Sequence, residues 1–210
     1  MKGIPKMIEK YVSKCNLDTE KVKEIVSKLE TWRNVRHIET ESQKPSLLAN
    51  VLEELTELER GKLSKNIHEM IDAYCDVVVF TLNACDISKA INTECDDKQD
   101  VCLYKFEIDD NNDYLYSIKL ISQLCMAVEE FRTEGKECRY REAYKLVALC
   151  FSLINSLGYD PYGCLNETIN EISSRTGTWD EKIKKFVKDT SDEAKARWYK
   201  ANYDLCKKGE

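Results

Sequence analysis

Residues that interrupt regular secondary structure are scarce in this chain. Its 210 residues include only three prolines and seven glycines. Long apolar runs are missing as well, and none approaches the roughly 20 residues that a membrane-spanning helix needs. The N-terminus, Met1-Lys-Gly-Ile-Pro, has no signal-peptide apolar core. We therefore expect a cytoplasmic protein without a membrane partner.

Several motifs that would indicate a particular chemistry are also missing. The ten cysteines form no C-x-x-C pair, and neither His37 nor His68 has a Cys or His partner at ligand spacing, so a zinc site has no support. Cysteines of a cytosolic protein should be reduced, and Cys75, Cys85 and Cys150 fall in apolar runs that favour a core role. No dinucleotide-binding glycine motif, Walker-type loop or Gly-x-Ser-x-Gly sequence occurs, so neither the usual nucleotide-binding loops nor serine-hydrolase chemistry is indicated.

Positive charge is in deficit. The formal net charge is −6 at pH 7, with 33% charged and 42% hydrophobic residues, which suits a soluble globular protein. A polymeric nucleic acid or an anionic membrane would require a basic face, so we expect neither as a partner. A small phosphorylated ligand held through a metal ion remains compatible with this charge.

Apolar residues recur mostly at intervals of three and four, which predicts an all-α fold. The expected helices span about 18–40, 46–60, 65–90, 113–134, 139–157, 161–175 and 191–207. Gly61 and Gly158 are expected to end helices, and Pro161 to begin one. We expect a linker at 91–112, with a short extended piece at Val101–Phe106.

Two segments resemble each other, namely 50–90 and 126–157, and each reads as a helical hairpin. Glu130 would match Glu54, but the second copy has no Glu-x-x-Asp pair. This pattern suggests a tandem duplication in which one hairpin kept an acidic site, giving a four-helix core. Helical periodicity alone would also create such a likeness.

We therefore expect a single domain over residues 1–210. Its 18–90 half would carry the acidic site, and 113–210 would hold the degenerate second half and C-terminal helices.

Acidic residues on two neighbouring helices are the most informative feature. Glu54 and Glu57 are three residues apart, as are Glu69 and Asp72, so each pair shares a helix face. Asp72 and Asp76 also fall within an apolar run that should be buried. Buried carboxylates are costly and repel one another. A hard divalent cation such as Mg²⁺ would relieve both problems, because it takes oxygen ligands and bridges phosphates.

These residues resemble a family signature. Glu-Glu-x-x-Glu at 53–57 followed by Glu-x-x-Asp at 69–72 is similar to the motif of the all-α nucleoside triphosphate pyrophosphohydrolases, the MazG-like proteins, whose relatives include phosphoribosyl-ATP pyrophosphohydrolase and the dimeric dUTPases. Asp76 resembles the phage-type branch, and 171–188 looks like the C-terminal part of phage MazG-like chains. The resemblance covers about 30–90 well and the rest loosely.

The resemblance implies a MazG-like helical bundle that cleaves a (d)NTP into the monophosphate and pyrophosphate with Mg²⁺, or with Mn²⁺ in its place. By resemblance, the metal ligands are Glu54, Glu57, Glu69 and Asp72, with Asp76 as an auxiliary ligand or a group supporting one. Glu53 would activate the attacking water, although the roles of Glu53 and Glu54 could be exchanged.

The rest of a nucleotide needs cations for its phosphates and an aromatic plane or an amide for its base. The candidate cations are Arg36, Lys44, Lys182, Lys184, Lys185 and Lys188. The candidate base contacts are Trp32, Asn83 and Trp179.

Three functions remain open. The first is a nucleoside triphosphate pyrophosphohydrolase acting on dUTP, dCTP or a non-standard nucleotide. The second is phosphoribosyl-ATP hydrolysis, which the long extra half of the chain disfavours. The third is a non-catalytic helical module that binds a nucleotide or a protein. Relatives commonly dimerise, so we expect a homodimer, although a duplicated chain could suffice as a monomer. The sequence fixes neither the base nor the number of metal ions.

Overall fold

The structure is a computed structural model that describes residues 17–85, 87, 113–132, 140–183 and 185–209. The expected linker at 91–112, including Val101–Phe106, lies outside these residues. The elements are α1 (Thr19–Val35), α2 (Thr40–Gln43), α3 (Leu47–Ser64), α4 (Ile67–Ala84), α6 (Asp113–Arg132), α7 (Arg141–Ser156), α8 (Pro161–Ser174), β1 (Gly177–Asp180), β2 (Lys185–Lys188), α9 (Asp192–Lys195) and the 3₁₀ helix η1 (Tyr203–Cys206). The described chain is mostly helical, which confirms the coarse prediction of an all-α fold.

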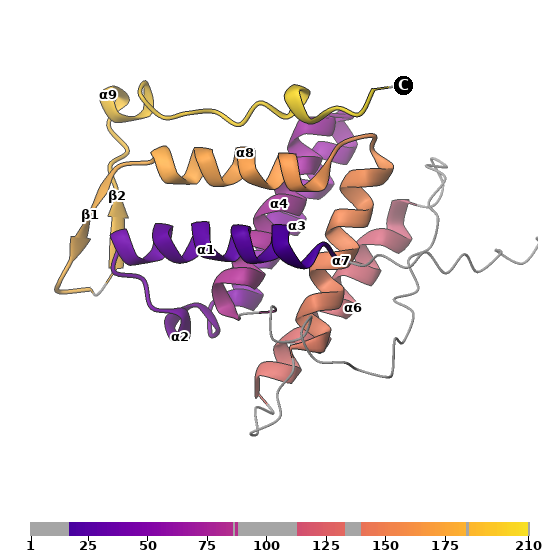
Figure 1. Ribbon diagram of the computed structural model, residues 1–210, viewed down its shortest axis with the longest axis horizontal. Helices are drawn as coiled ribbons and strands as arrows, with labels where there is room; N and C mark the ends of the chain where they lie inside the picture. The colour runs from indigo at the N-terminus through magenta and orange to yellow at the C-terminus, as the bar shows by residue number, and fades with distance from the viewer. Residues whose placement is uncertain (1–16, 86, 88–112, 133–139, 184, 210) are drawn as a thin grey trace, which may run out of the picture.

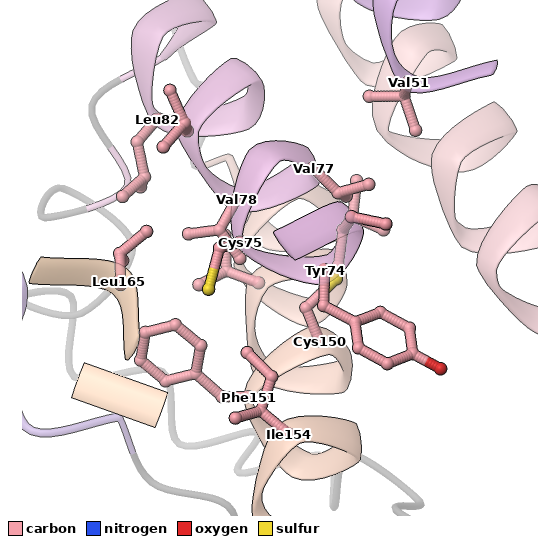
Figure 2. Close-up of a cluster of buried hydrophobic side chains, with 14 of the residues drawn as sticks. Val51, Tyr74, Cys75, Val77, Val78, Leu82, Cys150, Phe151, Ile154 and Leu165 are labelled. Carbon is pink, nitrogen blue, oxygen red and sulfur yellow. The ribbon is translucent and has the colours of Figure 1, made fainter. Parts of the chain in front are cut away.

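Helix α4 is the centre of the arrangement. It contacts α1, α2, α3, α7 and α8, so side chains on almost every face of it are buried. Figure 2 shows residues of α4 lying against Cys150, Phe151 and Ile154 of α7, with Leu165 of α8 completing the cluster. Burial on most sides explains why the sequence of α4 is apolar beyond a single stripe.

Two helical hairpins pack together around this centre. Helix α3 lies against α4, α6 lies against α7, and the hairpins meet through α4 with α7 and through α3 with α6. In the second hairpin, Glu130, the sequence counterpart of Glu54, bonds backbone groups. The Glu130 carboxylate accepts hydrogen bonds from the backbone N–H groups of Arg141 and Glu142, at 2.8 and 3.0 Å. It therefore caps the start of α7.

Side-chain caps begin several of the helices. The Asp18 carboxylate accepts hydrogen bonds from the backbone N–H groups at the start of α1, and Asp160 does the same before Pro161 at the start of α8. Gly158 takes the left-handed conformation after α7, with φ of +89°.

The expected helix end at Gly61 is wrong, because α3 continues to Ser64 and Lys65 adopts φ of +55°. Gly61 instead permits close packing of the hairpin. A Cβ there would lie 3.2 Å from both the backbone nitrogen and Cγ of Met70.

The region after α8 differs most from expectation. Instead of one helix over 191–207, the chain forms the short α9, an irregular stretch and η1. Before them, β1 and β2 form an unpredicted antiparallel hairpin in which Gly177 pairs with Lys188 and Asp180 with Lys185. Residues 196–208, here named the C-terminal strap, run along α8 (Figure 1). Side chains of α8 bond the strap's backbone N–H groups, so these groups need no helix to find partners.

Cysteines of the described chain are free thiols. Cys75, Cys85 and Cys150 are buried, which confirms their predicted core role. Within the described ranges, the helices are too short or too polar to cross a membrane.

Gly177 generates the first prediction, because the β-hairpin leaves it almost no room. A Cβ at this position would overlap the Val187 carbonyl oxygen and lie 2.7 Å from Phe186 Cζ. We expect Gly177→Ala to lower the free energy of unfolding by about 1–3 kcal/mol, as overpacking commonly does. Thermal denaturation followed by circular dichroism measures the change. Gly209→Ala is the control, since a Cβ there meets nothing within 4 Å. Equal melting temperatures for the two variants would contradict the assigned packing.

Candidate active site

The α3–α4 hairpin brings carboxylates from its two helices together. Glu54 and Glu57 lie on α3, Asp72 and Asp76 lie on α4, and each of the other three raises the pKa of Glu54 by electrostatic repulsion. The spacing of three or four residues on each helix places both members of a pair on the facing surface. We name these four residues the acidic cluster.

Glu54 is half-buried among the other carboxylates of the cluster, and its pKa is raised by both burial and repulsion. Burial is the largest cause that raises the pKa of its carboxyl, followed by Asp76, Glu57 and Asp72, and together they bring it to about 8. Its Oε2 atom is buried and has no hydrogen-bond partner. A buried carboxylate oxygen without a partner is costly in a folded chain.

The two aspartates of α4 are also perturbed. Burial, and then the charge of Asp72, raises the pKa of Asp76 to about 7, while Arg175 and Lys188 act in the opposite direction. Burial likewise raises the pKa of Asp72, against a hydrogen bond from Tyr203 and the charge of Arg175. The positive and hydrogen-bonding groups that act on these two aspartates therefore come from the C-terminal part of the chain.

The remaining predicted acidic residues lie at the edges. Glu53 is exposed on α3, next to Glu54. Glu57 is exposed as well and pairs with Arg60 at 3.5 Å, although its charge still acts on Glu54 and Asp72. Glu69 is half-buried in the first turn of α4, where the Ser64 hydroxyl donates a 3.5 Å hydrogen bond to its carboxylate.

The cluster is not a ready-made coordination shell. Among the residues that the structure describes, no group of three or more His, Cys, Asp or Glu side chains is arranged to hold a metal ion. The carboxylates lie near enough to repel one another, but they would have to change rotamers to share one ion.

Arg175 is a functional candidate that the sequence did not single out. It follows α8 directly, and its guanidinium donates to the Glu171 carboxylate at 2.9 Å and lies over the Trp198 ring at 5.9 Å. Its Nε atom is buried and has no hydrogen-bond partner. Electrostatic action on both Asp72 and Asp76 puts this charge next to the acidic cluster.

Arg36 has a structural position that argues against the expected phosphate contact. Its Nη2 atom donates to the carbonyl oxygens of Ile172, Ser173 and Arg175 at 3.0 to 3.2 Å. The guanidinium also lies 5.0 Å from the Trp32 ring. Arg36 therefore caps the C-terminus of α8, where a cation is favourable.

The expected base contacts are likewise engaged within the protein. The indole N–H of Trp32 donates to the Ile172 carbonyl oxygen at 3.2 Å. Asn83 is buried, and its side-chain oxygen accepts a hydrogen bond from Arg33 at 2.6 Å. Trp179 lies in β1 with its ring 5.9 Å from that of His37. The contacts described for these three residues therefore do not connect them to the acidic cluster.

The lysines expected to contact phosphate lie in different parts of the fold. Lys44 is largely buried and pairs with Glu41 at 3.3 Å. Lys185 lies in β2, but its side chain is outside the described part. Lys188, at the other end of β2, acts electrostatically on Asp76.

Arg175 and Tyr203 could not be found from spacing because they lie about 100 residues or more from α4 in the chain. The resemblance drawn from the sequence over 171–188 included Arg175 without giving it a role, and it did not reach Tyr203. Comparisons with known protein families, with curated proteins and with solved structures find no match to this chain.

A prediction on pH follows from Glu54, whose pKa rises from 4.5 to about 8 on folding. The folded chain then holds this proton more tightly than the unfolded chain, so the contribution to stability is complete below pH 4.5 and is lost as the pH rises toward 8. Glu54→Gln should therefore stabilise the protein at pH 8, on the order of 1–2 kcal/mol because solvent screens this partly exposed group, and have little effect at pH 4.5.

Urea denaturation in a chelator at the two pH values measures this effect. Glu30→Gln removes an exposed carboxylate from α1 and is the matched control, with no expected change in pH dependence. A Glu54→Gln profile parallel to that of the wild type would contradict the electrostatic picture.

Proposed function

We propose that this protein is a Mg²⁺-dependent nucleoside triphosphate pyrophosphohydrolase that cleaves a (d)NTP to the monophosphate and pyrophosphate. One observation supports the proposal above the others. A buried Glu54 oxygen has no partner while three further carboxylates repel it. A fold that keeps such a cluster without function would give up stability for nothing, so the cluster is better explained as a cation site.

The donor set suits Mg²⁺ by its chemistry. All four members of the cluster are carboxylates, and hard divalent cations such as Mg²⁺ prefer oxygen ligands of this kind. Glu54, Asp72 and Asp76 would hold the ion, with Glu57 turning inward from its pair with Arg60. Glu69 would join if its carboxylate left Ser64. Bound Mg²⁺ would supply neutralisation of the phosphate oxygens and of the charge that develops on the leaving pyrophosphate.

The chain's own residues would carry the remaining steps. The charges of Arg175 and Lys188 act on Asp76, so these two cations replace Arg36 as the proposed phosphate contacts. Glu53 is exposed next to the cluster, so it is free of burial and can accept a proton from an attacking water. Glu54, which is buried among the other carboxylates, is better suited to the ion.

We further infer that the fold is MazG-like and arose by duplication of a helical hairpin. The packing of the α3–α4 hairpin against the α6–α7 hairpin is what this history would produce. In the second copy, Glu130 caps α7, so this carboxylate keeps a structural role although the Glu-x-x-Asp pair is missing. The four-helix unit is then contained in one chain, while dimerisation stays a prediction.

The principal test is a pyrophosphate-release assay with Mg²⁺ and a panel of nucleoside triphosphates that includes phosphoribosyl-ATP. We expect Asp72→Asn and Glu54→Gln to lower kcat/KM by about 100-fold or more, the scale observed when one electrostatic contact to a transition state is removed. Glu59→Gln, which changes an exposed carboxylate on the same helix, is the control.

The panel also separates the alternatives. Turnover confined to phosphoribosyl-ATP would replace the proposed substrate class. A folded wild-type protein that releases no pyrophosphate from any member would overturn the enzyme and favour a non-catalytic binding module.

Arg175 gives a separate prediction about substrate binding. If its guanidinium contacts a phosphate, Arg175→Gln should raise KM by about 10-fold to 100-fold, the equivalent of one hydrogen bond to a charged group. Arg197→Gln changes an exposed arginine whose side chain donates to the Glu193 carbonyl oxygen, and it is the matched control. Equal KM values for the two variants would remove Arg175 from the substrate site.

A further inference from the structure

Tyr203 of the C-terminal strap makes a contact that joins the far end of the described chain to the acidic cluster. We propose that Tyr203 is a positioning residue for Asp72, whose hydroxyl fixes one carboxylate oxygen so that the other can be offered to a divalent cation. The inference rests on the proposed function, because it deepens the account of the same cation site.

The contact itself is short and buried. The Tyr203 hydroxyl donates to Asp72 Oδ1 at 2.5 Å, across 131 residues of sequence. Tyr203 is only 4% exposed, so water does not compete strongly for this hydrogen bond. Hydrogen bonds to metal-binding side chains commonly set their orientation and strengthen ion binding.

Burial of the phenol alone does not account for the contact. The Thr168 hydroxyl lies 2.9 Å from the same phenol oxygen and could satisfy a buried tyrosine by itself. The ring of Tyr203 also packs against the edge of His68, with 6.0 Å between centroids. The bond to Asp72 is therefore additional to what folding of the strap requires.

The strap is held in place along its whole length, antiparallel to α8. Tyr199 and Ala201 donate their backbone N–H groups to Ser174 Oγ and Glu171 Oε2, at 2.8 and 2.9 Å. Further along, Asn202 donates to Glu167 at 2.9 Å. At the other end of α8, the Asp160 N–H donates to the Cys206 carbonyl oxygen at 2.8 Å. Figure 1 shows the strap following α8 toward the start of α4.

These bonds give Tyr203 a fixed place relative to α4. Helix α8 packs directly on α4 and on η1, so the phenol and the Asp72 carboxylate are attached to elements that contact each other. A hydroxyl fixed in this way can restrict the rotamer of the Asp72 carboxylate.

The experiment compares two tyrosines of the same strap. Tyr203→Phe removes the hydroxyl at Asp72, and Tyr199→Phe removes a hydroxyl that donates to Glu167, also at 2.5 Å, away from the cluster. Calorimetry of the full chain with Mn²⁺ alone measures ion binding. We expect the dissociation constant to rise about 10-fold in Tyr203→Phe, the lower part of the range for such supporting contacts, and to stay unchanged in Tyr199→Phe.

A second comparison shows whether Tyr203 acts through Asp72. In a double-mutant cycle, Tyr203→Phe should have no further effect on Mn²⁺ affinity once Asp72 is replaced by Asn. In the pyrophosphate assay, Tyr203→Phe should shift the Mg²⁺ concentration of half-maximal rate upward. Partial unfolding would lower the maximal rate without moving that midpoint, so a poorly folded variant still gives an answer.

The outcomes separate the two proposals. Wild-type protein that binds neither Mn²⁺ nor Mg²⁺ overturns the proposed function, and this inference with it. Wild-type protein that binds Mn²⁺, with unchanged affinity and midpoint in Tyr203→Phe, overturns the inference alone. Equal losses in the Tyr203 and Tyr199 variants would also overturn it, because they would indicate a general effect on the strap.

Discussion

Partial burial of acidic side chains on a helix that packs against five others is the constraint on which this structure depends. Helix α4 is the common neighbour of α1, α3, α7 and α8, yet it carries Asp72 and Asp76 among its apolar residues. The charges of these residues, together with Glu54, oppose folding unless positive or hydrogen-bonding groups reach them. Much of the remaining chain can be understood as the supply of those groups.

The supply comes from the C-terminal part of the chain. Arg175 follows α8, Lys188 ends β2 and Tyr203 lies in η1, and each moderates the charge of Asp72 or Asp76. The β-hairpin and the strap are therefore more than peripheral additions to a helical bundle. A motif search confined to the two acidic helices would find the negative half of the site and miss the groups that balance it.

The sequence predicted what depends on neighbours along the chain. Each acidic pair could be placed on one face of its helix because helical spacing is fixed, and Pro161 marked the start of α8. Gly61 was misplaced as a helix end, since its role is close contact with Met70 across the hairpin. The strap was missed because its backbone N–H groups bond side chains of α8 that lie 25 to 35 residues away, and the β1–β2 hairpin was not predicted. The place of Arg36 at the end of α8 could not be foreseen either, because its carbonyl partners lie about 140 residues away in the sequence.

Arg36 has a consequence for how disturbances spread through the molecule. One guanidinium joins the end of α1, the last carbonyl groups of α8 and the aromatic ring of Phe186 in β2. Arg175 leaves α8 at that same junction. Loosening of α1, by heat or by sequence drift, would therefore be transmitted through Arg36, together with Trp32, to the backbone that carries Arg175. Natural variation at position 36 would in this way change the position of Arg175 beside the acidic cluster, although Arg36 itself does not contact the cluster in the described bonds.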